Sequence, residues 1–123
     1  MSLIPFVIEH AVSNGSYTDQ PNIFTEYSCV TKDQLHQTFI DEIVEFMYEF
    51  CSAEYGHGIE ITSYDDFCEK YYDENCRVED VPLYIMRYFV DGEWHIWEPN
   101  THSIDIYRSY LTLSEQRQSI YKR

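Results

Sequence analysis

The longest regular pattern of hydrophobic positions runs from about residue 31 to residue 55. Apolar side chains recur there every three or four residues, which is the spacing of one face of an α-helix. Thr31 is followed three residues later by Gln34, as in a capping box, and Gly56 and Gly58 supply a helix stop. We therefore predict a long amphipathic helix with one face in the core. Its repeating apolar positions are Leu35, Phe39, Ile43, Met47 and Phe50.

A shorter helix is predicted over residues 64–75. Ser63 stands where an N-cap residue is expected, and the helix dipole favours the carboxylates of Asp65 and Asp66 in the first turn. Acidic side chains occupy most of the remaining surface of this segment. The apolar positions that would face the core are Tyr64, Phe67, Cys68 and Tyr71.

Extended segments account for two further apolar runs. Residues 3–8 predict a short strand, and Pro5 within it predicts that the strand is an edge strand or irregular, because proline cannot donate to the hydrogen-bond ladder. Residues 23–30 are rich in β-forming side chains and partly alternate, which predicts a second strand.

Residues 83–98 give the clearest strand signal, a β-hairpin. The dipeptide Asp91-Gly92 is typical of a two-residue hairpin turn, and β-forming residues flank it on both sides. Both faces of this hairpin are largely apolar or aromatic, so we expect it to be central in the fold or to offer one face to a partner. The turn predicts the opposed pairs Phe89 with Trp94, Arg87 with Ile96, Tyr88 with His95, and Met86 with Trp97.

The C-terminal part is predicted to be helical. Residues 103–111 fit a helical period better than strict alternation, and Ser114 is a candidate cap for a separate short helix that ends near Tyr121. The whole chain of 123 residues has the length of one domain. We predict a single α+β domain over residues 1–123, with a small antiparallel sheet packed against the long helix. The sheet contains the hairpin 83–98 and the strand 23–30, the long helix is 31–55, and the second, acidic helix is 64–75.

Charge is distributed unevenly along the chain. The formal net charge is −14, from 22 acids and 8 bases. Residues 41–80 hold 13 acids against Lys70 and Arg77, a net charge of −11, whereas residues 107–123 carry four bases against one acid, a net charge of +3. Phosphates and anionic membranes are bound by clustered Lys and Arg, so the composition argues against both as direct ligands.

Two interpretations of the acidic excess stay open. In the first, the surface imitates a polyanion and steers the chain toward a basic partner. In the second, the acids form only the solvated face of two amphipathic helices. Asp41, Glu45 and Glu49 stand four residues apart, so they line one side of the long helix, with few Lys residues beside them. Two such acidic helices side by side would approximate one strand of DNA phosphates.

Tyrosine adds to the case for a binding surface. The chain has twelve tyrosines, several of them next to acids, and tyrosine is enriched at protein interfaces. The alternative is that these rings lie between core and surface in a small fold. We predict a surface that binds a basic protein through acids of both helices, with two tyrosines as anchors. The predicted partner-binding residues are Asp41, Glu42, Glu45, Tyr48, Glu49, Asp65, Asp66, Glu69, Tyr72 and Asp73.

Patterns for catalysis or metal binding are weak. Zinc sites usually pair their ligands at short spacing, but Cys51, His57, Cys68 and Cys76 are separated by five, ten and seven residues. The EF-hand pattern is absent, and none of the five histidines stands in a recognisable catalytic motif. We therefore predict that the protein is not an enzyme and that it holds no metal or cofactor.

The sequence predicts a cytoplasmic, non-enzymatic protein. No segment approaches the roughly 18 consecutive apolar residues of a membrane span, and the cysteines are expected to be buried free thiols. Its composition resembles that of small acidic inhibitors encoded by phages and mobile elements, including nucleic-acid mimics and nuclease immunity proteins. We expect it to inhibit a nucleic-acid-binding protein or nuclease by occupying its basic surface. The alternative is a structural protein that oligomerises through the hairpin 83–98.

Overall fold

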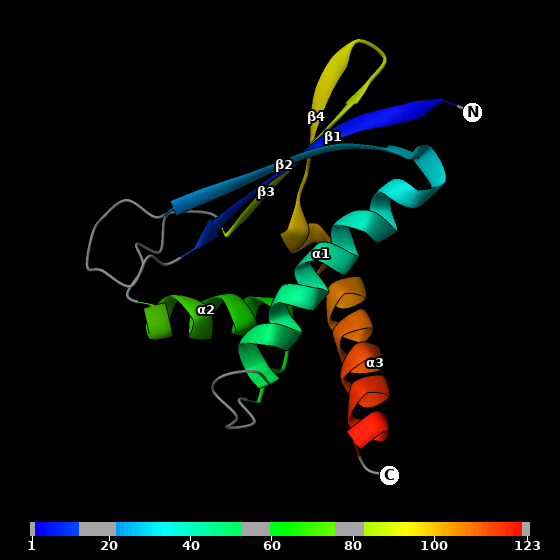
Figure 1. The fold of residues 1–123 in the computed structure, drawn as a ribbon. Coiled ribbons are helices and arrows are strands. Elements are labelled where there is room, and N and C mark those ends of the chain that lie inside the picture. The colour runs from blue at the N-terminus through cyan, green and yellow to red at the C-terminus, as the bar shows by residue number, and fades with distance from the viewer. Residues whose placement is uncertain (1, 13–21, 53–59, 76–82, 122–123) are drawn as a thin grey trace.

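One antiparallel sheet of four strands, in the order β2-β1-β3-β4, lies above a layer of helices (Figure 1). The computed structural model describes residues 2–12, 22–52, 60–75 and 83–121. This arrangement confirms the predicted α+β class. The elements are β1 (Leu3–Val12), β2 (Asn22–Thr31), α1 (Lys32–Ser52), α2 (Tyr64–Asn75), β3 (Tyr84–Val90), β4 (Glu93–Trp97), the 3-10 helix η1 (Pro99–His102) and α3 (Ser103–Tyr121).

The first strand corrects the prediction of an edge or irregular strand. β1 is internal, because it pairs with β2 on one side and with β3 on the other. Its register explains how Pro5 is tolerated: β3 pairs with β1 only between Phe6 and His10, so Pro5 has a neighbouring strand on one side alone, where it lies opposite Cys29. The edges of the sheet are β2 and β4.

The hairpin of β3 and β4 confirms the prediction in detail. All four predicted pairs, from Phe89 with Trp94 to Met86 with Trp97, are opposed in the sheet. Asp91 and Gly92 have φ angles of +55° and +79°, the left-handed values that a turn of this type requires. A residue with a Cβ other than Asn or Asp would be strained at these positions, which is why this dipeptide was a reliable signal.

The core lies between the inner face of the sheet and the helices. Phe39, Ile43 and Met47 of α1 have no exposed area, and the Phe39 ring meets Phe6 of β1 edge-on with the centroids 5.5 Å apart. All five repeating positions predicted for the long helix are buried. The second helix packs its own predicted face against α1, since Phe67 also has no exposed area.

The helix ends agree only in part with the predictions. α2 has the predicted bounds, and the amide of Asp66 donates to the Ser63 hydroxyl as an N-cap should, at 3.0 Å. α3 is one continuous helix, so Ser114 lies inside it and does not cap a separate helix. α1 is described as far as Ser52, and the predicted stop at Gly56 and Gly58 lies outside the described residues.

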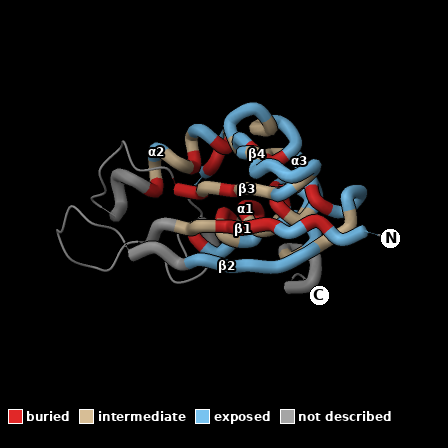
Figure 2. Tube along the Cα trace, turned by 90° about the horizontal axis from the view of Figure 1, so that it is seen from above, coloured by how far each residue is buried: buried red, intermediate tan, exposed pale blue. Residues whose placement is uncertain are grey.

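No helix of the described chain covers the outer face of the sheet, which Figure 2 shows from above. Side chains alternate along a strand, so the neighbours of core-facing residues point outward. Tyr27, Trp94 and Ile96 point this way and are 75%, 53% and 63% exposed. Arg87 and Glu9 form an ion pair on the same face. The hairpin thus has one face in the core and one face open.

Candidate functional site

Glu42 of α1 lies near three other carboxylates, one from β2 and two from α1. We call Glu26, Glu42, Glu45 and Glu49 the α1–β2 carboxylate cluster. Glu26 stands opposite Ile8 of β1, so it points to the helix side of the sheet. Partial burial of Glu42 raises its pKa above the ordinary 4.5, and the negative charges of Glu26, Glu49 and Glu45 raise it further.

The negative field of this cluster reaches into the core. Tyr84 of β3 is buried, and its hydroxyl has no hydrogen-bond partner among the described residues. Burial is the main cause of the raised pKa of Tyr84, and the charge of Glu42 is the next. The charge of Glu42 therefore adds to burial in keeping the Tyr84 hydroxyl protonated.

Among the described residues, little positive charge compensates the cluster. None of the ion pairs between described residues involves Glu26, Glu42 or Glu49. Glu45 is the exception, because the Arg117 guanidinium of α3 donates to both of its carboxylate oxygens, at 2.9 and 3.2 Å. The basic C-terminal segment therefore folds back against one member of the predicted acidic row.

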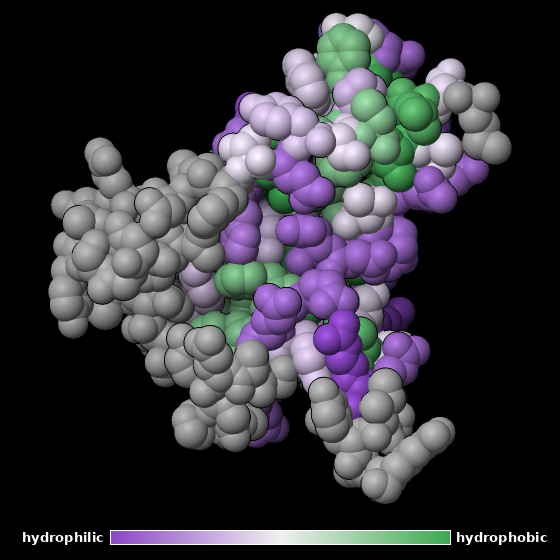
Figure 3. Space-filling view, viewed as in Figure 1, coloured by the Kyte–Doolittle hydropathy of each residue, from purple (hydrophilic) through white to green (hydrophobic). Residues whose placement is uncertain are grey.

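Asp41 and Tyr48, the remaining predicted residues of α1, lie with Glu45 on the side of α1 that faces α3. Asp41 accepts a hydrogen bond from Gln37 at 2.7 Å and borders, with Glu45 and Arg108, a groove between α1 and α3. Tyr48 is half-buried, and Arg117 lies over its ring, 4.9 Å from the centroid. Figure 3 shows mainly hydrophilic side chains in the middle of the molecule, where α1 lies in Figure 1, and apolar ones near the projecting hairpin.

On α2, one predicted residue has a structural role. Asp66 accepts from the Thr62 amide at 2.9 Å and pairs with Lys70 at 3.1 Å, and the Thr62 hydrogen bond is the first cause of its lowered pKa. Asp65 and Glu69 are exposed. The side chains of Tyr72 and Asp73 lie outside the described part of the chain.

The two acidic helices do not lie side by side as parallel rods. Figure 1 shows their axes crossing, and they meet through apolar rings rather than acids. Phe46 and Phe50 of α1 pack on Phe67 and Tyr71 of α2, with centroids 5.2 to 5.8 Å apart. The charges that raise the pKa of Glu42 come from α1 and β2, and none of them comes from α2. Sequence reasoning missed Glu26, because only the tertiary fold brings β2 to α1.

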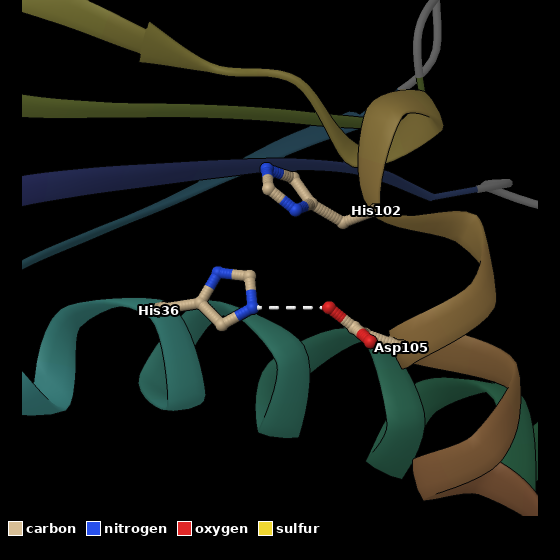
Figure 4. Close-up of side chains that lie close together, drawn as sticks. All are labelled: His36, His102 and Asp105. Carbon is tan, nitrogen blue, oxygen red and sulfur yellow. Dashed lines mark ion pairs between the residues drawn. The ribbon is translucent and has the colours of Figure 1, made fainter.

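A second cluster combines His36 of α1, His102 of η1 and Asp105 of α3 (Figure 4). His36 Nε2 lies 3.6 Å from Asp105 Oδ2, and the two histidine rings are 4.7 Å apart. Burial, followed by the charge of His36, lowers the pKa of His102. Trp97 holds both histidines: its ring stacks on His102 at 4.4 Å, and its Nε1–H donates to His36 Nδ1 at 3.2 Å. No short-range spacing in the sequence links His36 to the other two residues.

The two described cysteines are free thiols, as expected, but only Cys68 packs against the core. Cys29 is free and exposed, because it lies on the edge strand β2. Cys68 is free and half-buried, and burial raises its pKa to about 11, so the free side chain is a protonated thiol at neutral pH. His57 and Cys76 lie outside the described residues, as does the side chain of Cys51.

No protein-family model, curated protein or solved structure matches the chain. Among the described residues, no helix is both long enough and apolar enough to cross a membrane.

Proposed function

We propose that this protein binds a basic surface of another protein through the α1–β2 carboxylate cluster. The observation that carries the proposal is the position of Glu42, which is partly buried beside three other carboxylates. Like charges at this spacing destabilise a helix, and perturbed pKa values are concentrated at functional sites. A cationic side chain of a partner would supply the charge that the described chain does not place beside Glu26, Glu42 and Glu49.

The proposed partner is a nucleic-acid-binding protein or nuclease. Such proteins present clustered Lys and Arg to phosphates, and a chain with a net charge of −14 would be steered toward the same groups. The protein would act as an inhibitor or nucleic-acid mimic by occupying that surface, without catalysis of its own. It would therefore compete with nucleic acid for its partner.

Competition with duplex DNA tests this proposal. The immobilised protein is expected to retain basic proteins from a cell lysate at about 50 mM salt and to release them at about 200 mM salt, because charge-driven contacts weaken with ionic strength. A duplex oligonucleotide added at low salt should release the same proteins. Retention that survives both treatments would rule out a mimic of nucleic acid.

The open sheet face favours a second candidate function, assembly with further copies of the chain. Its support is the exposure of Trp94 and Ile96, at 53% and 63%, on the outward side of the hairpin. Sedimentation equilibrium over a wide concentration range is expected to reveal an oligomer that Ile96→Lys dissociates. A wild-type protein that stays monomeric at high concentration would remove this candidate.

A further inference from the structure

We propose that His36, His102 and Asp105 form a binding site for a zinc-class divalent cation that joins α1, η1 and α3. The three residues offer one ligand atom each, and all three atoms lie within 4.8 Å of one another (Figure 4). No motif in the sequence points to this site, because α1 is far along the chain from the adjacent elements η1 and α3. The proposal is independent of the carboxylate cluster and of the proposed partner.

The distances suit a small coordination sphere. Zinc–ligand bonds of about 2.0–2.1 Å at tetrahedral angles place neighbouring ligand atoms roughly 3.3 Å apart. His36 Nε2 and Asp105 Oδ2 are already 3.6 Å apart. The third atom, on His102, needs to approach by at most about 1.5 Å, which requires the His102 ring to rotate out of its stack on Trp97.

The donor set selects the class of cation. Two imidazoles with one carboxylate favour Zn²⁺, Ni²⁺, Co²⁺ or Cu²⁺, whereas Mg²⁺ and Ca²⁺ prefer oxygen ligands alone. The His36 and Asp105 side chains are 45% and 55% exposed, so solvent reaches the site and water can complete the coordination. The cation would cross-link the first half of α1 to the start of α3.

Trp97 contacts both histidines, so its fluorescence can report cation binding at the site. Indole N–H can only donate, so a neutral His36 that accepts this bond at Nδ1 carries its own proton on Nε2, the atom that faces Asp105. A cation bound at Nε2 takes the place of that proton, which must move to Nδ1 for His36 to remain a neutral ligand, and the Nδ1–H then displaces the Trp97 hydrogen bond. Movement of His102 toward the cation would also change its stacking on the Trp97 ring.

The experiment titrates the intact protein with Ni²⁺, a quenching ion that shares the ligand preference of zinc, while tryptophan fluorescence is followed. The chain has two tryptophans, so Trp94→Phe leaves Trp97 as the only reporter. Saturable quenching with one ion per chain is expected, and calorimetry with Zn²⁺ should give the same stoichiometry. His102→Ala and Asp105→Asn are each expected to weaken binding at least about tenfold.

His95→Ala is the matched control, because it removes an imidazole from the hairpin and leaves the cluster intact. It should bind Ni²⁺ as the Trp94→Phe parent does. Asp105→Asn keeps the shape of the side chain at a surface position, and circular dichroism verifies that each variant is folded. The proposal is overturned if the parent shows no saturable quenching, or if His102→Ala and Asp105→Asn bind as tightly as His95→Ala.

Discussion

Phe39→Ala is expected to lower the free energy of unfolding by about 3–5 kcal/mol, the usual cost of removing a buried phenylalanine ring. Phe39 has no exposed area, and it joins α1 to three strands. Its ring centroid lies 5.5 Å from that of Phe6, 5.3 Å from that of Trp97 and 6.5 Å from that of Tyr88. The cavity would lie at the centre of the sheet–helix interface, where neighbouring rings can close it only in part.

Chemical and thermal unfolding followed by circular dichroism measures this effect. For a chain of this size the loss corresponds to a fall of about 10–25 °C in melting temperature. Phe89→Ala is the matched control, because it deletes the same ring from the outer face of the sheet, where Phe89 is 37% exposed and packs on Trp94 at 5.3 Å. Its expected cost is about 1 kcal/mol. Equal losses in the two variants would contradict the assignment of inner and outer faces.

The local elements were predictable because local rules determine them. The two-residue turn at Asp91-Gly92 permits one hairpin register, and the apolar stripe from Leu35 to Phe50 permits one buried helix face. The prediction for β1 was wrong on position, since a strand's place in a sheet depends on partners far along the chain. A general rule confines proline to edge strands, but Pro5 lies in an internal strand because β3 pairs with β1 only beyond it, from Phe6 to His10.

The candidate site was predictable only along α1. Helical spacing alone places Glu42, Glu45 and Glu49 within reach of one another. The addition of Glu26 and the pairing of Glu45 with Arg117 both depend on how β2 and α3 pack against α1. The histidine cluster was missed for the same reason, because η1 brings His102 to α1 across more than sixty residues of sequence.

The triple variant Glu26→Gln, Glu42→Gln, Glu49→Gln is expected to lose partner binding and to gain stability at neutral pH. Binding should fall because the variant lacks the three cluster carboxylates that form no ion pair within the described chain. Retention of basic proteins on the immobilised variant measures the loss. The matched control, Asp91→Asn with Glu93→Gln and Glu98→Gln, removes three exposed charges from the hairpin region. Equal loss in both variants would mean that net charge alone drives binding.

Stability should change in the opposite direction to binding. Each like-charge contact costs about 0.2–0.5 kcal/mol, so removing the repulsion among these residues should raise the free energy of unfolding by about 1 kcal/mol. The pKa of Glu42 is raised in the folded state, so its ionisation opposes folding, and wild-type stability falls as the pH rises through that pKa. The gain from Glu42→Gln should therefore be present at pH 7 and disappear below about pH 4, where the unfolded chain also holds Glu42 protonated.

This pair of outcomes separates a binding site from an acidic surface that only keeps the chain in solution. Carboxylates retained for binding leave the free protein less stable than it need be, and neutralising them recovers that stability at the expense of affinity. A solvated face offers no binding to lose, so neutralisation there would change stability alone. Thermal unfolding at about pH 3 and pH 7, with the retention assay on the same preparations, distinguishes the two. A variant that binds as the wild type does would overturn the proposed role of the cluster, whatever its stability.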